Sequence, residues 1–130
     1  MKQTLWAMVL GAGLLGLAYV GSLSTAQADA TCGAKGQTPC PLQGWMEDGM
    51  QKAVDKSDTK QLVSLFEQVA KLVPDPAWNA GNPSWAGISK AGADASKAGD
   101  LAGAKAQCKS CHKAFRDKYK SSFRMKPVPK

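Results

Sequence analysis

The feature that most constrains this chain is a short motif near its C-terminus, Cys108-Lys109-Ser110-Cys111-His112. Two cysteines separated by two residues and followed at once by a histidine form the attachment pattern of c-type haem. Each thiol would form one thioether bond to the porphyrin. On a helix, residues three and four apart share a face, so both sulfur atoms and the imidazole can reach one side of the macrocycle. The motif therefore predicts one covalent haem c, attached at Cys108 and Cys111, with His112 as the proximal axial ligand of the iron.

Three other interpretations of the motif compete with haem attachment. A thioredoxin-like redox pair lies beside a βαβ unit, and this sequence shows no such pattern. A closed zinc site needs four ligands, whereas His112 is the single histidine of the chain. An ordinary disulfide between Cys108 and Cys111 is the third alternative. Signs of export, described next, favour haem attachment.

The N-terminal segment, residues 1–28, has the pattern of a secretory signal peptide. Lys2 is followed by an apolar run from Leu5 to about Leu23, and Ala26-Gln27-Ala28 provides a cleavage site. An uncleaved membrane anchor is the alternative, because the run approaches the roughly 20 residues that span a bilayer. Both interpretations place the domain outside the cytoplasm, where bacteria attach c-type haem, so we expect a periplasmic protein.

A second cysteine pair, Cys32 and Cys40, lies in residues 29–41, whose glycine, threonine and proline content predicts a loop. In an oxidising compartment, with the other two cysteines bound to haem, we expect this pair to form a structural disulfide. A bond that closes so small a loop typically contributes about 2–3 kcal/mol to stability.

Four segments of the remaining chain show helical periodicity of their apolar residues. A residue that suits a helix N-cap, or a proline that suits the first turn, stands at the start of each segment. We predict helices over residues 42 to about 55, 59 to about 73, 85 to about 98, and 101 to about 120, with a loop over residues 75–83. The sequence therefore predicts an all-α fold.

Short connections between four amphipathic helices predict a small antiparallel up-down four-helix bundle. Both motif cysteines lie on the apolar stripe of the last helix, so we expect the haem within the helical core, where it adds apolar surface that a small domain lacks. Residues 42–122 would form this haem-binding domain. Residues 123–130 would form an extended basic tail.

The chain has a formal net charge of +7, and its basic residues gather towards the C-terminus. From Lys105 onward there are nine basic residues and one acidic residue, Asp117. A basic surface around a redox centre would steer acidic partners, whereas nucleic-acid binding fits an exported protein poorly. An ordinary solvated helix face is the alternative. We expect an acidic redox partner protein, no nucleic acid, and no membrane contact after signal cleavage; a homodimer remains open.

The motif continues as Lys113-Ala114-Phe115-Arg116, an aromatic residue followed by an arginine, on the last of four predicted helices. In these features the chain resembles the class II c-type cytochromes, the group that includes cytochrome c′. Gly44-Trp45-Met46 is loosely similar to the first helix of that family. The resemblance in architecture extends over about the whole chain that would remain after signal cleavage. It implies a contact between Arg116 and the haem propionates. The Cys32/Cys40 pair and the short first three helices depart from the family pattern.

The ligand opposite His112 decides the function, because six-coordinate iron with a strong ligand transfers electrons, whereas five-coordinate iron can bind a gas. A second histidine is excluded within one chain. Met46, Met50, Met125 or a lysine could supply the ligand. The register of antiparallel helices predicts Met46, with Met50 as the alternative. Core filling is the competing role for either methionine.

We therefore expect a periplasmic monohaem c-type cytochrome that carries electrons through Met/His-ligated iron. The alternative is a five-coordinate, cytochrome c′-like protein that binds a small gas such as NO or CO. An enzyme is disfavoured, because the sequence offers neither a distal histidine nor paired carboxylates for acid–base chemistry.

Overall fold

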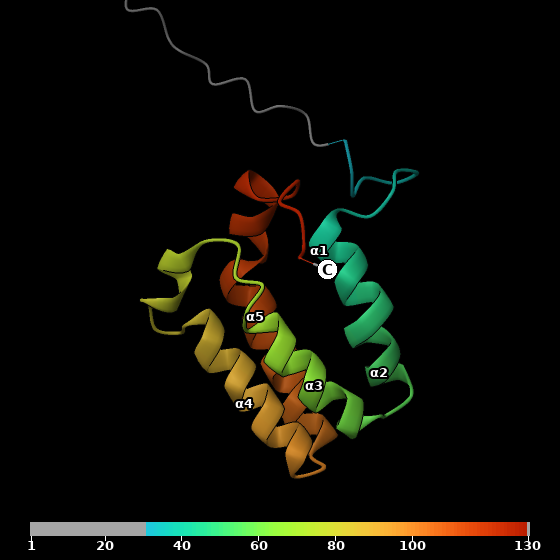
Figure 1. Ribbon diagram of the computed structural model, residues 1–130, viewed down its shortest axis with the longest axis vertical. Coiled ribbons are helices and arrows are strands. Elements are labelled where there is room, and N and C mark those ends of the chain that lie inside the picture. The colour runs from blue at the N-terminus through green and yellow to red at the C-terminus, as the bar shows by residue number, and fades with distance from the viewer. Residues whose placement is uncertain (1–30, 130) are drawn as a thin grey trace, which may run out of the picture.

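The computed structural model describes residues 31–129, and every regular element in that range is a helix. This confirms the all-α class. The elements follow in the order α1 (Pro41–Trp45), η1 (Met46–Gln51), α2 (Lys52–Asp55), α3 (Thr59–Val69), η2 (Pro76–Asn79), α4 (Trp85–Lys97) and α5 (Leu101–Ser122) (Figure 1). Within the described range, no helix has the length and apolar character needed to cross a membrane. The predicted signal peptide, residues 1–28, lies outside the described residues.

The first three elements run on without a break from Pro41 to Asp55, as the sequence predicts, and are called the first helical segment below. Pro41 occupies the first turn, and the backbone N–H of Cys40 donates to the Gln43 side chain at 3.4 Å. The middle of the segment, η1, is a π-helix. Such wide turns are rare and occur frequently at functional sites. The spacing of apolar residues in the sequence does not predict this π-helix.

The next helices begin where their capping residues predict. Each capping side chain accepts a hydrogen bond from a backbone N–H of the first turn: Asp58 from Gln61 at 2.9 Å, Ser84 from Gly87 at 3.0 Å, and Asp100 from Gly103 at 2.8 Å. Gly99, with φ +73°, supplies the left-handed residue between α4 and α5. These local signals fix the helix starts, so predicted and observed starts agree.

Two boundaries differ from the prediction. Helix α3 ends at Val69, because the following residues form a tight turn in which Leu72 N–H donates to the Val69 carbonyl group, ahead of Pro74. The predicted loop over residues 75–83 contains the short helix η2, which the Asp75 side chain caps through Ala77 N–H at 2.9 Å.

An aromatic cluster joins η2 to α4 and α5. The Trp78 ring of η2 stacks on Phe115 with centroids 5.1 Å apart, and Trp85 of α4 meets Phe115 edge-on at 5.6 Å. Trp85 also donates its indole N–H to the Val69 carbonyl oxygen at 2.7 Å, which satisfies its buried polar group. The sequence does not predict the burial of Trp78, because a loop residue belongs to no periodic pattern.

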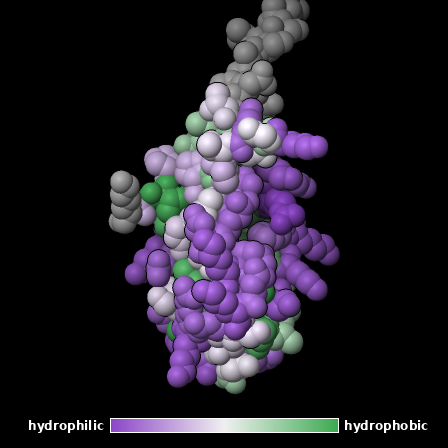
Figure 2. Space-filling view, turned by 90° about the vertical axis from the view of Figure 1, so that its right-hand side faces the viewer, coloured by the Kyte–Doolittle hydropathy of each residue, from purple (hydrophilic) through white to green (hydrophobic). Residues whose placement is uncertain are grey.

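Helix α4 packs closely against both α3 and α5 (Figure 1). Gly92 of α4 allows this approach, because a Cβ atom there would lie 2.3 Å from the Phe66 ring of α3. The first helical segment packs onto α3 through η1 and α2, with Gly49 against Leu65. Figure 2 views the molecule from the side of the first helical segment and shows that this face is mostly hydrophilic.

The C-terminal residues contact the rest of the protein, which their basic composition does not predict. Residues 123–129, called the C-terminal strap below, lie against the helices. Phe123 meets Trp78 edge-on with centroids 5.3 Å apart, Val128 packs against the core, and the Lys126 ammonium group donates to the Pro74 carbonyl oxygen. Apolar side chains at both ends of the strap gain burial in this way, which a basic composition does not reveal.

Candidate functional site

The motif predicted to hold haem lies in the middle of α5, where no turn or kink interrupts the helix. Cys108 and Cys111 are free thiols, half-buried and packed against the core. His112, four residues after Cys108, is exposed beside them. The structure therefore brings the two sulfur atoms and the imidazole to one region of the helix surface, as the spacing predicts.

Burial raises the pKa of both motif thiols. It raises that of Cys111 to about 12, with a further contribution from the neighbouring Cys108. The pKa of Cys108 is also raised, mainly by burial, although Lys105 opposes the rise. Both groups are therefore neutral thiols at pH 7. Reactive redox cysteines have lowered pKa values, so this pair lacks the electrostatics of a thioredoxin-like centre.

The imidazole of His112 has one clear partner. Arg116 Nη2 lies 3.0 Å from His112 Nδ1. A guanidinium group can only donate, so Nδ1 accepts and the proton of the neutral imidazole resides on Nε2. Partial desolvation lowers the pKa of His112, and the positive charge of Arg116 lowers it further. The imidazole is therefore neutral near pH 7. Coordination through Nε2 requires the proton on Nδ1, so it requires Arg116 to release this contact.

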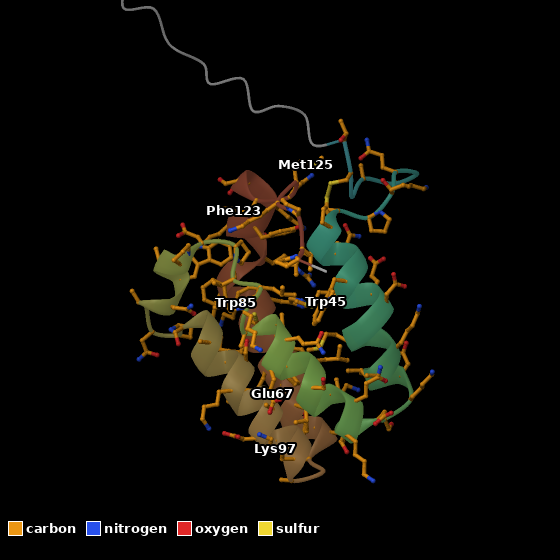
Figure 3. The ribbon with its side chains drawn as sticks, viewed as in Figure 1. Trp45, Glu67, Trp85, Lys97, Phe123 and Met125 are labelled. Carbon is orange, nitrogen blue, oxygen red and sulfur yellow. A yellow bond between two sulfur atoms is a disulfide. The ribbon has the colours of Figure 1, made fainter. Side chains whose placement is uncertain are left out.

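Five basic side chains recur every three or four residues along the exposed face of α5. They are called the basic stripe: Lys105, Lys109, Lys113, Arg116 and Lys120. Within residues 31–129, no ion pair involves them; ion pairs form elsewhere, as between Lys97 and Glu67 at 3.1 Å (Figure 3). His112 stands between Lys109 and Arg116 on the helix, so the stripe borders the motif.

The candidate distal methionines differ in their surroundings. Met50 is 7% exposed and belongs to the hydrophobic core, whereas Met46 is half-buried at its margin. Both lie in the π-helix η1. Met125 is 56% exposed and lies at the far end of α5 against the Cys32–Cys40 loop. Met50 therefore already fills core space, and of the two methionines in η1, Met46 is the one that is less committed to core packing.

The second cysteine pair has the predicted geometry of a disulfide, with sulfur atoms 2.12 Å apart and both side chains buried. Gly33, with φ +80°, lies close to it, since a Cβ atom there would stand 2.9 Å from the Cys40 sulfur. The loop thus closes tightly over the first turn of α1.

The donor set on α5 fits a c-type haem. Two protonated, half-buried thiols three residues apart and a neutral imidazole beside them are the groups such attachment uses. In the described part of the chain, no cluster of three or more His, Cys, Asp or Glu side chains is placed to hold a metal ion by itself. No protein-family model, curated protein or solved structure matches this chain.

Proposed function

We propose that this chain is an exported, monohaem c-type cytochrome that carries electrons, built as an antiparallel up-down four-helix bundle. The observation that carries the proposal is the placement of Cys108, Cys111 and His112 together on α5. When bound, the haem would supply a one-electron redox centre. We place the protein in the periplasm, where the proposed signal peptide would direct it.

Each residue of the motif has a distinct role. Cys108 and Cys111 would hold the haem through their sulfur atoms, and their half-buried position would keep the two thioether bonds partly out of water. His112 would be the proximal ligand. Arg116, once released from His112, has a free guanidinium group beside the motif, which suits a contact with a carboxylate such as a haem propionate.

Met46 is the distal ligand that we propose. It packs against the margin of the core rather than within it. A thioether opposite a histidine favours electron transfer over gas binding. Met50 is the alternative ligand, and its burial supports a packing role instead.

The basic stripe supports an acidic redox partner. His112 stands between two of its cations, Lys109 and Arg116, and none of the five has an ion-pair partner within residues 31–129. Their unbalanced field would raise the encounter rate with a negatively charged surface and orient that surface towards the motif.

The half-buried position of Met46 also leaves room for a second function, since a methionine at the core margin can stay off the iron. The protein would then be a five-coordinate, gas-binding cytochrome. Absorption spectra of the holoprotein, oxidised and reduced, with and without carbon monoxide, separate the two. An electron carrier has a low-spin reduced spectrum that carbon monoxide leaves unchanged. A spectrum that shifts with carbon monoxide contradicts methionine ligation and supports the gas-binding alternative.

A further inference from the structure

The C-terminal strap connects parts of the molecule that are far apart in the sequence. The Met125 sulfur lies 3.4 Å from the sulfur of Cys32, in the disulfide-bonded loop. The next residue, Lys126, donates from its ammonium group to the carbonyl oxygen of Pro74, beyond the end of α3. In Figure 3, Met125 lies between the end of α5 and the loop that precedes α1. The strap therefore touches the segments that flank α1 and α3.

The start of the strap is also fixed to α5. The Tyr119 hydroxyl donates to the Arg124 carbonyl oxygen at 3.1 Å. Burial raises the pKa of Tyr119, and the backbone of Leu42 and the charge of Arg124 oppose this rise, which places the hydroxyl beside the first turn of α1. Leu42, Tyr119 and strap residues together line a cavity of about 210 Å³. The end of α5, the strap and α1 thus meet at one end of the molecule.

The two ends of the first helical segment are held differently. Its later part, η1 and α2, packs onto α3, with Gly49 against Leu65. Its beginning, α1, is joined through Cys40 to the disulfide, and through the disulfide to Met125. Two contacts therefore set the position of α1 relative to the end of α5: the buried Leu42 beside Tyr119, and the strap.

We infer that Met125 and Lys126 are positioning residues, which hold α1 against the end of α5 through the strap and so fix how far Met46 stands from the haem-bearing face. Met46 follows α1 directly, so any outward movement of α1 carries it along. This inference rests on the proposed function for the part that concerns iron. The hold of the strap on α1 is a property of the polypeptide, and it can be tested by a measurement that does not depend on iron.

The first test is amide hydrogen exchange on the full chain as it is purified. Met125→Ala and a chain ending at Arg124 should raise exchange over residues 41–46 about tenfold or more, because both remove the contact with the disulfide, while α4 stays unchanged. Met125→Leu, which keeps apolar bulk, should restore most of the protection. Unchanged exchange over residues 41–46 in Met125→Ala would overturn the inference. That comparison decides even if the shortened chain does not fold.

The second test reads the position of Met46 in the holoprotein. Lys126→Met removes the donor to Pro74 but keeps an apolar side chain, and Lys60→Met, at an exposed position of α3, is its matched control. Lys126→Met and Met125→Ala should weaken the near-infrared methionine-to-iron band and admit carbon monoxide, whereas Lys60→Met should do neither. Variants that unfold at lower temperature yet keep the band would show a merely structural strap and overturn the inference. A wild-type chain that takes up no haem would contradict the proposed function instead, and the exchange test would still decide whether the strap holds α1.

Discussion

Arg116 Nη2 lies 3.0 Å from His112 Nδ1, on the nitrogen that does not bind iron when a histidine coordinates through Nε2. The guanidinium group has no lone pair to offer, so it selects the tautomer with the proton on Nε2. In the haem-free chain, Arg116 therefore keeps His112 in the form that cannot coordinate through Nε2. The same side chain becomes free for another partner once the tautomer changes.

This relationship predicts a measurable pKa difference. Arg116→Met should raise the pKa of His112, because it removes a positive charge that disfavours protonation. The chain has a single histidine, so its NMR titration in haem-free protein is unambiguous. Lys120→Met, which removes a charge one turn further along α5, should change the pKa less. A His112 pKa that stays the same or falls in Arg116→Met would contradict the contact.

The motif thiols should react slowly in haem-free protein. Their pKa values are raised, that of Cys111 to about 12, so alkylation by iodoacetamide at pH 7 should be slower than in the unfolded chain. The raised pKa values also make the free energy of unfolding depend on pH. Unfolded thiols lose their protons near pH 9, below the folded value, so stability is full below about pH 9 and falls as pH rises towards 12. Rapid alkylation of the folded chain at pH 7 would indicate a redox pair instead.

Separate alanine substitutions distinguish the two methionines of η1. Met46→Ala should abolish the near-infrared methionine-to-iron band of the oxidised holoprotein and open the iron to carbon monoxide. Met50→Ala should keep the band but lower the free energy of unfolding by about 2–4 kcal/mol, because Met50 is buried in the core. Loss of the band in Met50→Ala alone would assign the ligand to Met50.

The basic stripe should govern the ionic-strength dependence of electron transfer. Reduction by an acidic partner protein should slow as salt rises, since exposed charges are screened over about 10 Å at 0.1 M. Lys109→Glu should slow the reaction at low salt, whereas Lys60→Glu, at an exposed position of α3, should have a smaller effect. Equal rates for the two variants would show that the stripe is an ordinary solvated helix face.

The parts of the fold that sequence could predict are those set by local chemistry. Asp58, Ser84 and Asp100 cap their helices through hydrogen bonds that span three residues, so spacing alone reveals them. The placement of Cys108, Cys111 and His112 follows from helical periodicity in the same way. These features required no knowledge of the tertiary structure.

The features that escaped prediction depend on contacts between distant segments. Trp78 is buried among Trp85, Phe115 and Phe123, which come from α4, α5 and the strap. Lys126 reaches Pro74 across 52 residues of sequence, which no local pattern encodes. The composition of the strap therefore predicts a basic tail but does not predict its contacts with the helices.

Covalent attachment of haem at Cys108 and Cys111 is the central claim, and the mass of the purified protein tests it most directly. The chain should be produced in bacteria that export it and attach c-type haem, then treated with acid acetone and analysed by mass spectrometry. We predict that the colour stays with the protein and that the peptide containing both cysteines carries one haem. Cys108→Ala/Cys111→Ala should be colourless under the same conditions. Haem that passes into the solvent, leaving wild-type protein at the mass of the bare polypeptide, would contradict the account.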